Sequence, residues 1–188
     1  MDDKEESCCT IDYQHHKEIF ESRRQTFLQH PEQAFTTHRA EIRLIQDHYK
    51  EARVPGGYMI ACDEPVERGG MGKGPAPLQY LVSSVGLCLL SQLTQCASYL
   101  GVQINRAELT VTGEFDQRGK FGLADVPSAC RRFTYELDVD SPEQAEKVKE
   151  LLAFMERSCY ATNTLRQPVE VVPRLLLNGR QVTLGGAS

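Results

Sequence analysis

The chain has no excess of positive charge, since 21 Lys and Arg residues stand against 26 Asp and Glu and leave a net charge of −5. A nucleic-acid-binding protein needs a basic face, so this balance argues against a nucleic-acid partner. No run approaches the ~18 consecutive apolar residues that a membrane span requires. The acidic start MDDKEESCCT lacks the basic and apolar regions of a signal peptide. We therefore expect a cytoplasmic protein that does not bind membranes.

The chain also lacks internal repeats, and its composition is ordinary, with 40% hydrophobic and 25% charged residues among 188. This length suits one domain with a substantial core. Residues 1–10 are polar without periodicity, and we expect them to be disordered. Residues 12–30 carry apolar residues at helical spacing. We therefore divide the chain into an N-terminal extension with one helix, residues 1–34, and a single domain, residues 35–188.

The first part of the domain has the pattern of a β-meander. Residues 40–45, 50–54 and 58–62 are short strand-like runs, and turn residues separate them. A glycine-rich loop, ERGGMGKGPAP, follows. Its GGMGKG segment resembles a phosphate-binding loop but lacks the Lys-Ser/Thr ending, so we interpret it as a turn that leads into a helix.

A long apolar helix is predicted between Pro77, at its first turn, and Gly101, just past its end. Its apolar residues cover nearly the whole circumference, which predicts a buried central helix. These residues are Leu78, Leu81, Val82, Val85, Leu89, Leu90, Leu93 and Leu100.

The rest of the chain alternates between strands and one amphipathic helix. Residues 107–115 and 130–140 alternate as strands, and SPEQAEKVKELLAFMERS predicts a helix with Ser141 as its N-cap. The run VEVVPRLLL predicts a last strand that ends at Asn178–Gly179. This order predicts the α+β class: an antiparallel β-sheet with a long buried central helix and a second helix.

Seven cysteines, an odd number with irregular spacing, argue against a disulfide framework and for free thiols. We expect Cys62, Cys96 and Cys130 to be inert. Cys88 lies mid-helix and Cys159 lies where the second helix ends, so the fold could bring them together as a reactive pair.

A thiol reacts as its thiolate, which burial disfavours and a cation or a helix N-terminus favours. Cys88 is too deep in its helix for the N-terminal dipole, so a cation would have to reach it. Candidates on the early strands are Arg39, Arg43 and Arg53. If residues 161–166 begin another helical turn, Cys159 lies at the N-terminus of that turn. Taken alone, Cys88 is more typical of a core thiol, and Cys159 of a junction thiol without a role.

A Cys/His group near the N-terminus and a pair of arginines are two further candidate sites. Cys8, Cys9, His15 and His16 do not match common zinc-ligand spacing, so we predict no metal site. Arg131 and Arg132 lie on a strand edge, where we expect them to be ion-paired or exposed rather than part of a binding patch.

Together the motifs resemble one family. DEPVERGG, GPAPLQYLVSSVGLCLLSQL, GEFDQRG, SPEQAEKVKELL and ERSCYATNTLRQPVEV, in this order, resemble the OsmC/Ohr family of osmotically induced and organic hydroperoxide resistance proteins, OsmC-like branch. The resemblance covers roughly residues 36–179. It implies an OsmC-like intertwined homodimer, with active sites at the subunit interface and with no metal and no organic cofactor.

The resemblance also implies a chemistry. Cys88 would attack a small hydroperoxide and become a sulfenic acid, Cys159 would form a disulfide with it, and a thiol or dithiol reductant would restore both. Leu78 stands where the family pattern has a glutamate, and Tyr160 where it has a proline. The alternative is a non-catalytic dimer of the same fold that binds a small apolar ligand and has packing cysteines.

Overall fold

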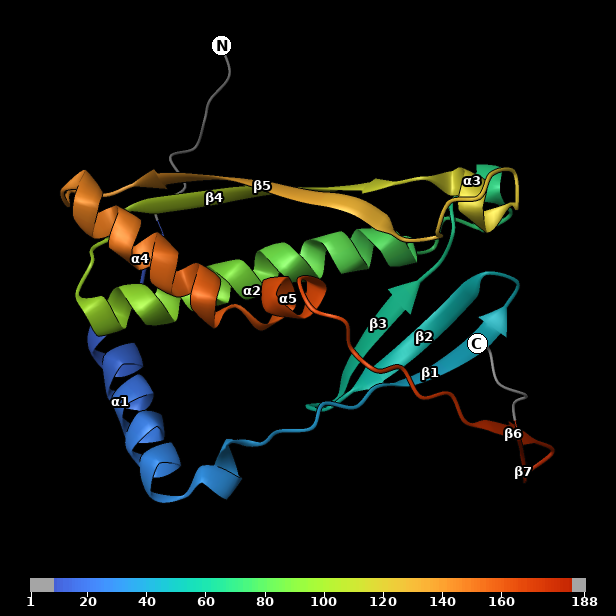
Figure 1. Ribbon diagram of the computed structural model, residues 1–188, viewed down its shortest axis with the longest axis horizontal. Helices are drawn as coiled ribbons and strands as arrows, with labels where there is room; N and C mark the ends of the chain where they lie inside the picture. The colour runs from blue at the N-terminus through green and yellow to red at the C-terminus, as the bar shows by residue number, and fades with distance from the viewer. Residues whose placement is uncertain (1–8, 184–188) are drawn as a thin grey trace, which may run out of the picture.

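The computed structural model describes residues 9–183. Its elements, shown in Figure 1, are α1 Tyr13–Gln29, η1 Pro31–Ala34, β1 Glu41–Gln46, β2 Tyr49–Val54, β3 Tyr58–Cys62, η2 Val66–Arg68, α2 Pro77–Leu100, β4 Arg106–Phe115, α3 Gln117–Lys120, β5 Cys130–Asp140, α4 Ala145–Ser158, α5 Tyr160–Leu165, β6 Leu175–Leu177 and β7 Arg180–Val182. The α+β class is confirmed. The expected disorder of residues 1–10 falls mostly on residues 1–8, outside the described part.

Helix α2 is the central element, and its predicted limits are confirmed. Pro77 is its first residue, and Gly101 ends it with a left-handed φ of 66°, a conformation that glycine adopts without steric cost. The Gln79 side chain accepts a hydrogen bond from the Ala76 N–H at 2.7 Å, which satisfies one of the free donors at the helix start.

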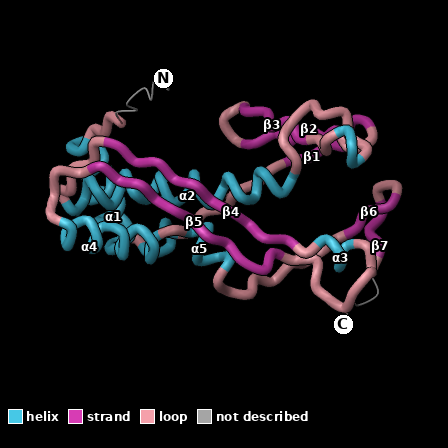
Figure 2. Tube along the Cα trace, turned by 90° about the horizontal axis from the view of Figure 1, so that it is seen from above, coloured by secondary structure: helices cyan, strands magenta, loops and turns pink. Residues whose placement is uncertain are grey.

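The expectation that α2 is buried all round is wrong for the single chain. Its buried face carries Val85, Leu89, Leu93 and Cys96, whereas Leu87 is 68% exposed. The reason is that the rest of the chain covers only part of the helix: the β4–β5 ribbon lies along one side, and α4 and α5 pack on another (Figures 1 and 2).

Helix α2 also corrects the expectation about membrane spans, because by length and composition it could cross a membrane, with a mean hydropathy of 1.3 over 18 residues. The core helix of a folded domain passes the same test. Here α2 packs against α1, α4, α5 and β4. This packing buries 33% of the 18-residue window within the single chain.

Within residues 9–183 the strands form three separate antiparallel sheets, not one: β1–β2–β3, β4–β5 and β6–β7. The meander is confirmed, with Asp47 in a left-handed turn at φ 48° between β1 and β2. Figure 1 shows the meander near the N-terminal end of α2, apart from the ribbon.

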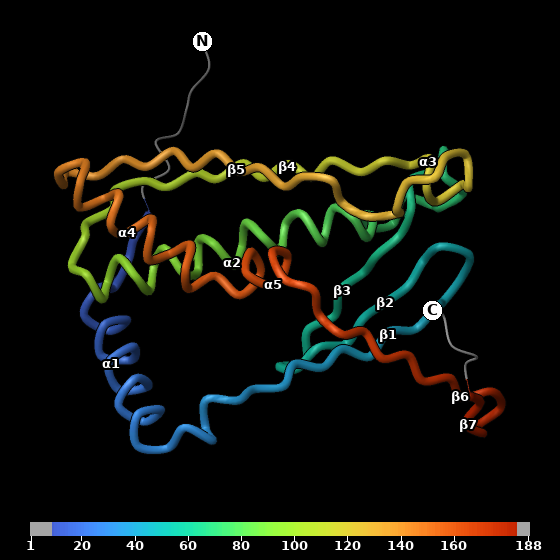
Figure 3. Tube along the Cα trace, in the orientation of Figure 1, coloured from blue at the N-terminus to red at the C-terminus, as the bar shows by residue number. Residues whose placement is uncertain are grey.

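Two boundaries differ from the sequence-based expectation. Helix α4 begins at Ala145, and Ser141 instead hydrogen-bonds the Gln103 carbonyl at 2.5 Å and accepts from the Glu143 N–H at 3.2 Å. The Ser141 side chain thus closes a turn before the helix. The last strand covers only Leu175–Leu177, because no strand in the described chain pairs with the residues before it and Pro173 has no N–H to donate. In Figure 3 the stretch between α5 and β6 runs away from α2.

The predicted N-terminal helix is confirmed as α1, and it packs on the C-terminal end of α2. The Phe20 ring lies 4.6 Å from the Tyr99 ring, measured between centroids, and also contacts Phe154 of α4 edge-on. The Tyr13 hydroxyl accepts a hydrogen bond from the Ile104 N–H at 2.7 Å. These contacts attach the extension to the domain.

The glycine-rich loop is organised by the carboxylate of Asp63, a side chain with no solvent exposure. It accepts hydrogen bonds from the backbone N–H groups of Glu64 at 2.8 Å, Met71 at 3.0 Å and Lys73 at 3.1 Å. A Cβ at Gly70 would lie 1.8 Å from the Glu64 carbonyl oxygen, so only glycine fits there. The loop therefore binds its own carboxylate and sets the start of α2.

Candidate active site

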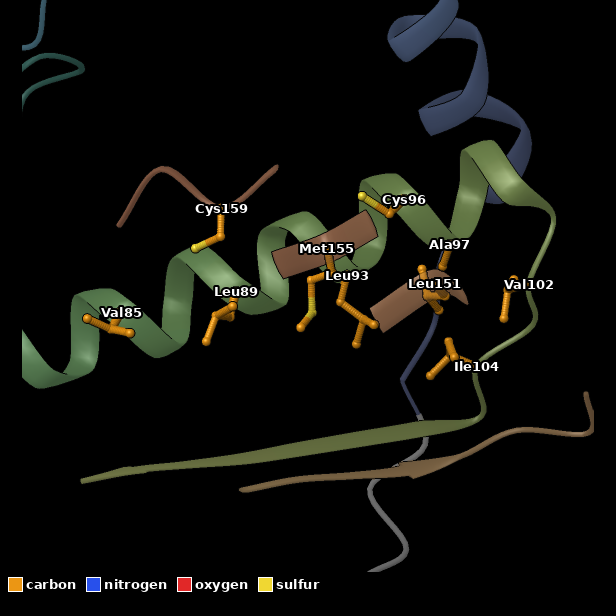
Figure 4. Packing of buried hydrophobic residues seen from close by; sticks show 10 residues of the cluster. All are labelled: Val85, Leu89, Leu93, Cys96, Ala97, Val102, Ile104, Leu151, Met155 and Cys159. Atoms are coloured by element: carbon orange, nitrogen blue, oxygen red, sulfur yellow. The ribbon is translucent and has the colours of Figure 1, made fainter. Parts of the chain in front are cut away.

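The fold brings Cys88 and Cys159 together. Cys88 lies in the middle of α2 and is half-buried, and Cys159 lies between α4 and α5 with no exposed surface. Figure 4 shows the Cys159 side chain directed toward α2. Both thiols are free. Each thiol is close enough to change the pKa of the other.

Local sequence fixes the position of Cys159. Helix α4 stops at Ser158, Cys159 has extended backbone angles of φ −77° and ψ 111°, and α5 begins at the next residue. The Asn163 side-chain amide donates to the Cys159 carbonyl at 2.9 Å and to the Arg157 carbonyl at 3.0 Å. The Cys159 carbonyl also accepts the backbone N–H of Asn163 at 3.1 Å, the first helical bond of α5. Asn163 therefore starts α5 with its backbone and binds the end of α4 with its side chain, which holds the junction.

The surroundings of the two sulfurs favour an anion on Cys159. Burial raises the pKa of the Cys159 thiol, but the hydroxyl and N–H of Thr162, the Cys88 thiol and the Ala161 N–H outweigh burial, so the pKa is lowered. Burial also raises the pKa of Cys88, and the neighbouring Cys159 raises it further against the Ala161 and Tyr160 N–H groups, so that it stays above its ordinary value.

The predicted helical turn after Cys159 is confirmed as α5. The arginines expected to act on Cys88 are not among the groups that most affect its pKa. Arg39 is instead paired with Glu41 at 2.9 Å, and Arg43 and Arg53 lie on the exposed side of the meander strands β1 and β2. Activation of Cys88 by one of these arginines therefore stays a prediction.

The other cysteines occupy different surroundings. Cys96 is fully buried against α4, and burial raises its pKa in spite of the nearby Ser158. Cys9 directs its thiol to the Asn105 carbonyl at 3.3 Å. Among residues 9–183 no group of three His, Cys, Asp or Glu side chains could hold a metal ion, and Cys8 lies outside this range.

Sequence reasoning missed the polar residues around Cys159. The Tyr135 hydroxyl of β5 donates to the Glu156 carboxylate of α4. Burial, this hydrogen bond and the charges of Glu156 and Cys159 raise the pKa of Tyr135 to about 12, although Arg166 opposes them. The inward position of Tyr135 in an alternating strand was the available signal, but its partner on α4 could come only from the fold.

Two cavities of different chemistry lie near the pair. One, of about 600 Å³, is mostly apolar and lies between the meander and α2, where it is lined by Leu87, the residue before Cys88. The other, of about 250 Å³, is lined by Val85, by Thr162 and by several arginines.

Known proteins share the sequence pattern and the fold. The family model described as OsmC-like protein matches residues 70–174. The hydroperoxide reductase of Mycoplasma pneumoniae is 30% identical over 97 residues, which cover 50% of this chain but 64% of the relative, less than two thirds of its length. The hydroperoxide reductase of Mycoplasma genitalium is 25% identical over 126 residues, 65% of this chain and 82% of the relative.

A solved structure shares the fold. The crystal structure of an OsmC-like protein from Mycoplasma pneumoniae aligns with a TM-score of 0.60 and 24% identity, over 70% of this chain and 88% of that chain. The family model alone spans more than half of the sequence. The chain therefore belongs to the OsmC-like protein family.

Proposed function

We propose that the protein reduces hydroperoxides through Cys88 and Cys159. The observation that carries this proposal is that the fold packs two free thiols 71 positions apart into one cluster, Cys88 from mid-α2 and Cys159 from the α4–α5 junction. They are close enough for each to change the pKa of the other. Two relatives named hydroperoxide reductase support the substrate class.

The two thiols can divide the chemistry between them. When the pair carries one negative charge, a proton transfer from Cys88 to the Cys159 sulfur leaves a Cys88 thiolate. This thiolate attacks the outer oxygen of the hydroperoxide, the O–O bond breaks, and the alkoxide takes a proton to leave as an alcohol. Cys159 then attacks the Cys88 sulfenic acid, a disulfide forms, and water leaves. Two electrons pass from the thiols to the peroxide.

We further propose that the working form is a homodimer. Large apolar side chains of the meander and of α2 face solvent in the single chain, among them Ile42 at 62%, Leu44 at 70% and Leu87 at 68% exposure. A second copy that covers these side chains would bury the exposed face of α2. It could also bring to Cys88 side chains that the single chain does not place there. Sedimentation should give twice the chain mass of 21.1 kDa. A monomer at micromolar concentration contradicts this proposal.

The test of the thiol pair is a map of its disulfides. One equivalent of an organic hydroperoxide is added to the reduced protein, free thiols are then alkylated, and the digest is analysed by mass spectrometry. We expect one cross-linked peptide pair, Cys88 with Cys159. Cys96 is the internal control: burial raises its pKa, so it should resist the peroxide and be alkylated only once the protein is unfolded in denaturant.

A second candidate function is a binding protein for a small apolar ligand, which the apolar cavity of about 600 Å³ supports. The same experiment separates the two. If hydroperoxide forms no disulfide between residues 88 and 159, and neither thiol is alkylated faster than a free model thiol, the cysteines are packing residues and the peroxidase proposal fails.

A further inference from the structure

Three arginines line the smaller cavity beside the thiol pair: Arg131, Arg132 and Arg166. No acidic residue lines this cavity of about 250 Å³. None of the three arginines takes part in the ion pairs found within the described residues. Both Arg131 and Arg132 are exposed, which confirms the expectation that they are ion-paired or exposed.

The neighbouring carboxylates are engaged elsewhere. Asp116 binds Arg118 at 2.6 Å, and this contact, with a smaller effect of Arg131, lowers the pKa of Asp116 to about 2. Glu156 accepts the hydrogen bond of Tyr135. In a chain with a net charge of −5, the residues that line the cavity thus carry three positive charges and no carboxylate, although Asp116 interacts with Arg131 and Glu156 lies at the hydroxyl of Tyr135.

A β-bulge explains how two consecutive strand residues line one cavity. Glu114 pairs with Arg132 and Phe115 with Cys130, so Arg131 is the extra residue of β5 and has no partner on β4. In a regular strand, Arg131 and Arg132 would point to opposite faces. A bulge bends the strand locally and redirects a side chain, so both can reach the same space.

The cavity lies next to the sulfurs without including them. Thr162, which also lines it, donates its hydroxyl to the Cys159 carbonyl at 3.3 Å and lowers the pKa of the Cys159 thiol. Val85 precedes Cys88 by about one helical turn. On the other side of Cys88, Leu87 lines the apolar cavity, which suits the hydrocarbon part of an organic hydroperoxide. The basic cavity suits a small ligand of the opposite kind, one with a carboxylate.

We propose that the arginine-lined cavity binds a small anionic thiol, the reductant of the Cys88–Cys159 disulfide, through its carboxylate. This inference rests on the proposed function. The bound thiolate attacks the Cys88 sulfur, the S–S bond breaks, and Cys159 leaves as a thiolate that Thr162 and the Ala161 N–H stabilise. A second thiolate attacks the mixed disulfide on Cys88. The products are the external disulfide and two reduced cysteines, and two electrons enter the protein.

The test measures reduction of the oxidised protein by two thiols of similar size, neutral 2-mercaptoethanol and anionic 3-mercaptopropionate, with rates corrected for the thiolate fraction. The disulfide is first formed with a chemical oxidant, so peroxidase turnover is not needed. The measured quantity is the ratio of the two reduction rates, anionic thiol over neutral thiol, divided by the same ratio for a small model disulfide. We expect a value of about ten or more at low salt and a smaller value at high salt. The double variant R132Q/R166Q should lose this preference, whereas R24Q on α1, the charge control, should keep it.

Each outcome decides a different point. Equal preference for both thiols in the wild-type protein, or a preference that survives in R132Q/R166Q, overturns the anionic-reductant site and leaves the proposed function intact. The oxidation step is tested in the same way, with anionic 3-hydroperoxypropionate against neutral ethyl hydroperoxide. If the anionic reagent is preferred in the oxidation step and not in the reduction step, the cavity belongs to the peroxide and the inference is overturned. If no oxidant forms the Cys88–Cys159 disulfide, the proposed function fails as well.

Discussion

Replacement of Cys88 by serine is expected to lower the rate of organic hydroperoxide consumption by at least about 10³-fold. A serine hydroxyl does not ionise near neutral pH and is a poor nucleophile toward an O–O bond. The Cys88 side chain is only half-buried, and a serine of nearly the same shape can keep its neighbours, so C88S should fold normally. The measurement is peroxide consumption with a dithiol as reductant, together with circular dichroism.

Two further variants make this result specific. C96S changes a cysteine on the same helix two turns away and should keep the activity, with some loss of stability because Cys96 is fully buried. C159S should still consume one equivalent of peroxide as a Cys88 sulfenic acid, but should not form the internal disulfide.

The lowered pKa of Cys159 makes the reverse assignment testable. If C159S loses the first equivalent and C88S keeps it, Cys159 is the attacking residue. If C88S turns over like the wild type, the thiol mechanism is wrong.

Replacement of Asp63 by alanine is expected to lower the thermal midpoint by roughly 5 °C or more at neutral pH. The change leaves the N–H groups of Glu64, Met71 and Lys73 without their acceptor in a loop that leads to α2. Thermal unfolding followed by circular dichroism measures this effect. Asp125→Ala, on an exposed loop, is the matched control and should change the midpoint little.

The stabilisation that Asp63 provides should decrease as the pH falls. Burial opposes its charge, but three backbone N–H groups and Lys50 outweigh burial and lower the pKa of Asp63. A carboxylate whose folded pKa is lowered stabilises the protein above its unfolded pKa, near 3.9, and loses this effect as the pH falls through the folded value. The difference between wild type and D63A should therefore narrow below about pH 4. A constant difference down to pH 2 would show that the charge of Asp63 is unimportant.

The elements that the sequence predicted well are those with local signals. Pro77 and Gly101 limit α2 because proline fits the first turn of a helix and glycine adopts the left-handed angle after the last. The Ser141 cap was wrong because a serine before a helix can also close a turn, and its contact with Gln103, 38 positions away, favoured the turn. The run from Val169 to Leu177 reads as a strand, but a strand needs a partner, and in the part of the chain that the structure describes only Leu175–Leu177 has one.

The sequence by itself determined that the chain is an α+β domain of the OsmC-like family with candidate thiols at Cys88 and Cys159, because periodicity, caps and motif order are local properties. Only the tertiary structure decided that the two thiols interact and that Cys159 has the lower pKa. It also decided that Arg131, Arg132 and Arg166 line one cavity. The physical reason is that pKa values and cavities depend on distances between groups far apart in the chain, which packing of α2 against α5 and β5 sets.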